Sequence, residues 1–256
     1  MNRLKSELLK YKRTFMGNLI VFIPIFFVLY ACITQATLLK NPLSQSSSWS
    51  WDNLLVLVFN SWPVIFLPLG MGLFATLVAG QERKAGNYRT LCAYNVSPMA
   101  IWINKVMAMS VYTLLSTLVL IVVTIMSGLF LAEGEISFGK IIVGGFACWF
   151  VSLSLIPIQL WAATWKGTLL SMGIALVGMM VGVLTAIKSL WIAVPWAWAM
   201  RLMCPIIGVH PNGMILDTGN PLLDSSVIPF GIIISLVVFV IITVITGIWF
   251  NRREVK

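Results

Sequence analysis

The chain has 256 residues, of which 59% are hydrophobic and only 10% are charged, and its mean hydropathy is +0.97. Several apolar stretches exceed the length of about 18 residues that is typical of a membrane-spanning helix, which excludes an ordinary soluble domain. The net charge of +9 does not indicate nucleic-acid binding, because Lys and Arg lie at the ends of the apolar stretches, as expected beside anionic lipid. The composition predicts an all-α integral membrane protein with a single transmembrane domain, residues 1–256.

Six membrane-spanning helices are expected along the chain, each long enough to cross about 30 Å of hydrocarbon. Their predicted ranges are 18–39, 54–80, 106–131, 139–163, 168–187 and 227–250. Most of the 17 Lys and Arg residues lie at the N-terminus, after the second and fourth spans, and at the C-terminus. The residues on the opposite side are Lys40, Lys140, Lys188 and Arg201. The positive-inside rule therefore predicts that both termini are cytoplasmic.

The residues before the first span have the pattern of an interfacial helix. Leu4, Leu8, Tyr11 and Phe15 recur at helical spacing on one side, and Lys and Arg occupy the other. This pattern predicts a helix that lies along the inner membrane surface. A basic tail without helical structure is the alternative.

The polar stretch QERKAGNYRTLCAYNVSPMAIWINK, residues 81–105, separates the second and third spans on the cytoplasmic side. Gly86 offers a bend, residues 88–94 can form a short helix along the surface, and Ser97 followed by Pro98 is typical of a helix start. A short helix against the inner face of the membrane is suited to docking a protein partner. The alternative is a solvated basic loop that only fixes the topology.

Polar residues inside the spans can be interpreted as part of a substrate path or as structural hydrogen-bonding groups. Asn60, Thr113, Thr117 and Gln159 either line a substrate path or make structural hydrogen bonds between helices. Prolines in the second and fourth spans, such as Pro63 and Pro157, predict kinks.

Small residues recur along the fifth span, and they include Gly178 and Gly182 at the spacing of a GxxxG pattern. This spacing favours close helix packing over a path. Between the fifth and sixth spans, residues 188–226 are too apolar for an exposed loop and are interrupted by prolines. They predict short re-entrant helices on the outer side.

Neither a catalytic nor a metal site is expected. No span carries Asp, Glu or His well inside its core, which argues against an intramembrane enzyme. His210 is the single histidine, and the four cysteines have no CxxC spacing. The sequence also lacks a G-x-x-x-x-G-K-[ST] phosphate loop, so any ATP and Mg²⁺ are expected on a separate chain.

The order E-R-K-A-G-N-Y-R, a short helix, Ser-Pro and a Lys opening the third span resembles the first cytoplasmic loop of ABC-2-type permeases. The whole chain is similar to permeases of lantibiotic-immunity transporters, of the MutE/EpiE or MutG type. Further matching pieces are LLKYKRTF at 8–15, VFNSWPVIFLPLG at 58–70, PWAWAMRLMCPIIGVHPNG at 195–213 and IPFGIIISL at 228–236.

In that family the first cytoplasmic loop contains a coupling helix that sits in a separate ATP-binding subunit. The resemblance implies that this subunit is contacted by Glu82, Arg83, Lys84, Gly86, Asn87, Tyr88 and Arg89.

The resemblance also implies a second six-span permease chain, not identical to this one, and a multi-pass location in the cell membrane of a Gram-positive bacterium. The function it implies is ATP-driven expulsion of a lantibiotic, a cationic antimicrobial peptide, for self-protection. An ABC-2 exporter of another hydrophobic substrate (a lipid, a drug or another peptide) is the main alternative. A sensor without transport is a lesser one.

Overall fold

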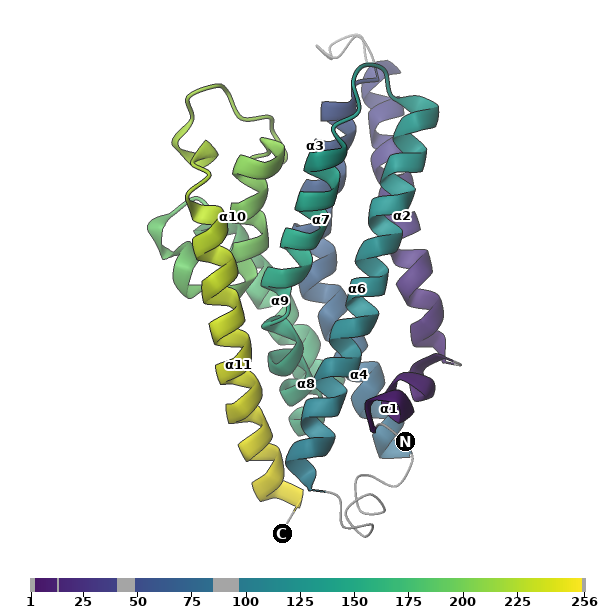
Figure 1. Cartoon of the computed structure of the whole chain (residues 1–256), viewed down its shortest axis with the longest axis vertical. Helices are drawn as coiled ribbons and strands as arrows, with labels where there is room; N and C mark the ends of the chain where they lie inside the picture. Colours follow the sequence, from purple (N-terminus) through teal and green to yellow (C-terminus); the bar gives the residue numbers. More distant parts are fainter. Residues whose placement is uncertain (1–2, 13, 41–48, 85–96, 255–256) are drawn as a thin grey trace.

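The computed structural model describes residues 3–12, 14–40, 49–84 and 97–254 of the chain. The described residues form a bundle of helices that run along its long axis, and both termini lie at the same end (Figure 1). We call this the termini end and the opposite one the loop end. The prediction of an all-α membrane protein is confirmed by the helices and their apolar lengths.

Five helical stretches are long and apolar enough to cross a membrane, and a bent helix pair makes a sixth. In chain order they are α2 (Phe15–Lys40), α3 to α4 (Trp51–Lys84), α6 (Pro98–Leu131), the pair α7 (Phe138–Ser152) and α8 (Leu155–Lys166), α9 (Thr168–Thr185) and α11 (Val227–Glu254). The six predicted spans coincide with these stretches. The fifth is shorter than predicted, since α9 ends at Thr185.

Proline explains the irregularities of the second and fourth spans. The helices α7 and α8 meet at an angle of 43° beside Leu153. Pro157 has no N–H to donate to the Leu153 carbonyl, four residues earlier, and its ring crowds that carbonyl, so the helix bends there. In the second span, α3 (Trp51–Ser61) passes through the π turn η1 (Trp62–Phe66), which contains Pro63, into α4 (Leu67–Lys84).

The N-terminal helix is present as α1 (Arg3–Lys12) and packs against α6. Tyr11 is buried, and Leu4 and Leu8 pack against the core, as their spacing predicted. Phe15 differs from the prediction, because it begins α2 and is 64% exposed. The apolar face of α1 therefore lies against the protein and ends before Phe15.

Short helices fill the segment between the fifth and sixth spans. The 3-10 turn η2 (Ser189–Ala193) leads into α10 (Pro195–Ile207), and η3 (Pro221–Leu223) precedes α11. Most of α10 is buried against α7, α9 and α11, beside the upper part of α11 in Figure 1. This burial is compatible with the prediction of re-entrant helices, which stays a prediction. Arg201 of α10 anchors the loop end by donating to the Leu222 carbonyl at 2.7 Å.

Candidate functional site

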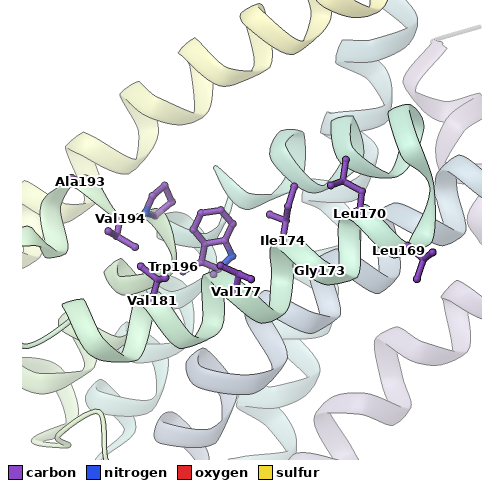
Figure 2. Close-up of a pocket in the computed structure, with 11 residues that line it drawn as sticks. Leu169, Leu170, Gly173, Ile174, Val177, Val181, Ala193, Val194 and Trp196 are labelled. Carbon is purple, nitrogen blue, oxygen red and sulfur yellow. The ribbon is translucent and has the colours of Figure 1, made fainter.

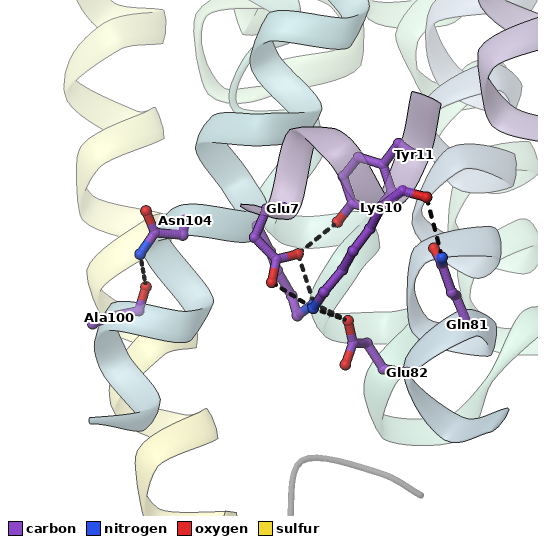
Figure 3. Close-up of polar contacts among 8 residues, drawn as sticks. Glu7, Lys10, Tyr11, Gln81, Glu82, Ala100 and Asn104 are labelled. Atoms are coloured by element: carbon purple, nitrogen blue, oxygen red, sulfur yellow. Dashed lines mark hydrogen bonds and ion pairs between the residues drawn. The ribbon is translucent and has the colours of Figure 1, made fainter. Parts of the chain in front are cut away.

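A cluster of four charged residues lies inside the termini end, and it joins three helices (Figure 3). We call Glu7, Lys10, Glu82 and Lys105 the charge cluster. The Lys105 ammonium lies 2.5 Å from the Glu82 carboxylate and 3.2 Å from that of Glu7. The Lys10 ammonium lies 2.7 Å from the Glu7 carboxylate and 3.1 Å from that of Glu82. Each cation thus bridges both acids.

Local structure places each member of the charge cluster. Glu7 and Lys10 are three residues apart on α1, so they lie on one face of that helix. Glu82 belongs to the last turn of α4. Lys105 lies two turns into α6, which begins where the Ser97 hydroxyl accepts a hydrogen bond from the Ala100 N–H. The charge cluster therefore connects α1 to both helices that flank residues 85–96.

Two further hydrogen bonds hold α1 at this position, and a third lies within α1. The Tyr112 hydroxyl of α6 donates to the Leu8 carbonyl at 2.7 Å, and the Gln81 amide of α4 donates to the Lys10 carbonyl at 3.4 Å. The Tyr11 hydroxyl donates to the Glu7 carboxylate at 3.3 Å. The contacts of Tyr112 and Gln81 fix the register of α1 against α6 and α4.

The electrostatics of the charge cluster balance two cations against two anions. Lys105 is fully buried, and Glu7 and Glu82 are 6% and 4% exposed. Burial disfavours the charged form of Lys10, but hydrogen bonding and attraction to Glu7 and Glu82 outweigh it and raise the pKa of Lys10. Each buried charge is thus paired, and removing any one of them leaves an opposite charge without compensation.

Three of the residues with a predicted role in coupling are described by the structure, and they differ in exposure. The carboxylate of Glu82 points into the charge cluster, whereas Arg83 and Lys84 are exposed. Gly86, Asn87, Tyr88 and Arg89 lie outside the described residues. A contact of Glu82 with an ATPase stays a prediction, but its carboxylate is already engaged by Lys10 and Lys105.

Sequence reasoning missed the roles of Glu7, Lys10 and Lys105. It assigned no role to Glu7, counted Lys10 and Lys105 among the basic residues that set topology, and took Lys105 also as the Lys that opens the third span. A signal was present in the distribution of acids. Glu7 is the single acid in the first fifty residues, and Glu82 is the single acid between Asp52 and Glu133. Isolated acids within basic segments beside spans indicate buried pairing.

The residues predicted to line a path make hydrogen bonds within the bundle. The Asn60 amide donates to the carbonyls of His210 and Pro211, both at 3.2 Å. Thr113 accepts a hydrogen bond from the Trp149 indole at 3.3 Å, and its carbonyl accepts one from the Thr117 hydroxyl. The side-chain amide oxygen of Gln159 accepts one from the Ser171 hydroxyl at 2.8 Å. Thr117 thus bonds within α6, whereas Asn60, Thr113 and Gln159 reach other elements. The Gln159 side-chain nitrogen has no hydrogen-bond partner in the described part of the chain. A role of the four residues in lining a path stays a prediction.

The glycine pair of α9 faces α10. A Cβ at Gly178 would fall on the Trp196 indole, and one at Gly182 would lie 3.0 Å from the Trp196 carbonyl. Trp196 also forms part of a groove of about 430 Å³ beside α9, together with Val177 and Val181 (Figure 2). The small residues thus allow close approach of two helices of the same chain.

Within residues 3–12, 14–40, 49–84 and 97–254, no three His, Cys, Asp or Glu residues are grouped so as to hold a metal ion. The charge cluster is electrically balanced and tied to helix ends, which is suited to transmitting movement between helices.

Comparison with known families gives one match. The family described as ABC-2 family transporter protein matches residues 3–182, more than half of the chain. No curated protein and no solved structure matches. The match includes α1, the second and third spans and the whole charge cluster. The chain therefore belongs to the ABC-2 transporter family, and it is the membrane component, or permease, of an ABC exporter that works with an ATP-binding partner subunit.

Proposed function

We propose that residues 83–96 dock into the ATP-binding subunit and that the charge cluster passes their movement to α1 and the spans. The observation that carries the proposal is the 2.5 Å pair between Glu82 and Lys105, which joins the two helices on either side of that segment. Lys10 and Glu7 extend the same contact to α1. A displacement of the segment thus changes the position of α1 as well as the ends of α4 and α6.

Exposed cations at the end of α4 provide the start of the docking surface. Arg83 and Lys84 are exposed, and the Arg83 guanidinium lies 3.2 Å from the position that a Cβ on Gly167 would take. Arg83 thus extends beside the turn between α8 and α9. An acidic groove on the ATP-binding subunit fits this surface.

A charge-reversal experiment tests the docking surface. We expect Arg83→Glu with Lys84→Glu to lower co-purification of the ATP-binding subunit at least several-fold, while the permease stays inserted in the membrane. Arg252→Glu with Arg253→Glu is the matched control, since both residues are exposed cations at the termini end on α11. Equal loss in both variants would attribute the effect to net charge, and retention in both would contradict docking at residues 83–84.

We further propose that the exported substrate is a lantibiotic and that a second, non-identical permease chain completes the transport path in the plasma membrane of a Gram-positive bacterium, with both termini cytoplasmic. The support is the full-length resemblance to lantibiotic-immunity permeases and the distribution of basic residues. Asn60, Thr113, Thr117 and Gln159 are engaged in hydrogen bonds within the bundle. This favours a path between the two permeases over one within this chain.

Peptide survival tests the substrate. The permease is expressed with its ATP-binding and permease partners in a sensitive Gram-positive host, and inhibitory concentrations are measured for a panel of lantibiotics. We expect protection against one or a few of them, lost when the ATP-binding subunit cannot hydrolyse ATP. An assembled complex that protects against none would move the proposal to another hydrophobic substrate of an ABC-2 exporter.

A further inference from the structure

A groove of about 670 Å³ between α2 and α6 has a polar end and an apolar length. The apolar walls come from both helices and comprise Ile20, Val21, Leu115, Leu118, Val119, Val122 and Val123. Lys12 and Asn18 line the polar end of the groove, beside the start of α2. The polar and the apolar lining residues thus occupy different parts of the same groove.

The length of the groove matches one leaflet of a bilayer. Its α6 wall runs from Tyr112 to Val123, and at 1.5 Å per residue this covers about 16 Å, half of the hydrocarbon core of a bilayer. Tyr112 lies at the polar end, where its hydroxyl donates to the Leu8 carbonyl of α1. The wall is thus long enough for an acyl chain of one leaflet that enters at the termini end.

The charge at the polar end selects the headgroup. Lys12 is exposed at the end of α1, and no ion pair joins it to any residue that the structure describes. Asn18 adds an amide donor, and the first turn of α2 contributes the positive end of its helix dipole. By contrast, the grooves beside α9 and beside the π turn are lined by apolar residues and glycine. An anion is favoured at the α2–α6 groove.

We infer that this groove binds an anionic glycerophospholipid, with its phosphate at Lys12 and Asn18 and one acyl chain along α2 and α6. The lipid lies against Tyr112, which also holds α1 through the Leu8 carbonyl. A bound lipid therefore stabilises the docked position of α1. This inference rests on the groove and on the membrane location, and it does not depend on the identity of the exported substrate.

Native mass spectrometry of the purified whole chain tests the inference, with phosphatidylglycerol and phosphatidylcholine titrated separately. We expect tighter retention of phosphatidylglycerol, and Lys12→Gln to weaken it about fivefold, as expected for loss of one cation near the surface. Lys5→Gln is the control, because Lys5 is an exposed lysine two turns earlier on the same face of α1. Equal retention of the two lipids, or equal effects of the two substitutions, would overturn the inference.

A second pair of variants tests the acyl chain without removing a charge. Val122→Trp fills the groove, and Leu129→Trp places the same bulk two turns further along α6; the two original side chains are similarly exposed, at 57% and 53%. We expect the first to abolish lipid retention and the second to leave it unchanged. Three results would overturn the inference. The first is unchanged lipid binding in Val122→Trp, and the second is full competition by glycerol phosphate alone. The third is a dimer that forms without lipid and is lost in Val122→Trp. Neither experiment measures docking of the ATP-binding subunit or protection against the substrate, so failure of the lipid inference is distinguishable from failure of the proposed function.

Discussion

The charge cluster and the glycine contact between α9 and α10 hold helices together by opposite means. At the termini end, three buried charges and the partly exposed Lys10 join α1, α4 and α6 through ion pairs. At the α9–α10 contact, Gly178 and Gly182 bring two backbones together against Trp196 without any charge. A shape contact resists small displacements in every direction. In the charge cluster each cation lies within ion-pair distance of both acids, so partners can be exchanged when the helices shift. Movement is therefore expected at the termini end.

The largest effect is expected from Lys105→Met, which removes the fully buried cation. Glu82 then loses its closer cation and Glu7 loses its more distant one. Lys10 alone remains to pair with the two acids. We expect a loss of about 3–5 kcal/mol in the free energy of unfolding. Denaturation of the purified permease in mixed micelles measures it.

The matched variant is Lys105→Met with Glu82→Gln, which restores charge balance, because Lys10 then pairs with Glu7. We expect this double variant to recover much of the lost stability. A double variant less stable than Lys105→Met would show that shape, and not charge, dominates this region.

A smaller effect is expected from Gly178→Leu, since the new side chain displaces the Trp196 indole. Overpacking of this kind costs about 1–3 kcal/mol. Gly173→Leu is the control on the same helix, because a Cβ at Gly173 meets no atom within 4 Å. The same denaturation assay compares the two, and equal stability would mean that Trp196 moves aside without cost.

The smallest effect is expected from Lys140→Ala at the loop end. Lys140 and Asp52 form an ion pair at 3.3 Å, but their side chains are 43% and 64% exposed. Water screens such a pair, so we expect a change of about 0–1 kcal/mol. A loss as large as that of Lys105→Met would show that burial does not explain the strength of the charge cluster.

The sequence was sufficient for the spans and for the helix start at Ser97, because these depend on local hydropathy and on N-capping chemistry. It was also sufficient for the apolar face of α1 up to Tyr11. The charge cluster was not predictable in detail, since Glu7 and Lys105 are 98 residues apart and no local period relates them. The same holds for Asn60, whose hydrogen-bond partners lie 150 and 151 residues later.

The central claim is that the charge cluster connects the ATP-binding subunit to α1. Its most direct test is the distance between spin labels at Leu9→Cys on α1 and Leu169→Cys on α9, in a complex whose four native cysteines have been replaced. Leu9 and Leu169 are both exposed, at 51% and 89%. We predict that ATP binding shifts this distance in the native complex, and that the shift disappears in Lys105→Met with Glu82→Gln while the ATP-binding subunit stays bound. An equal ATP-driven shift in both complexes, or none in the native one, would contradict the account.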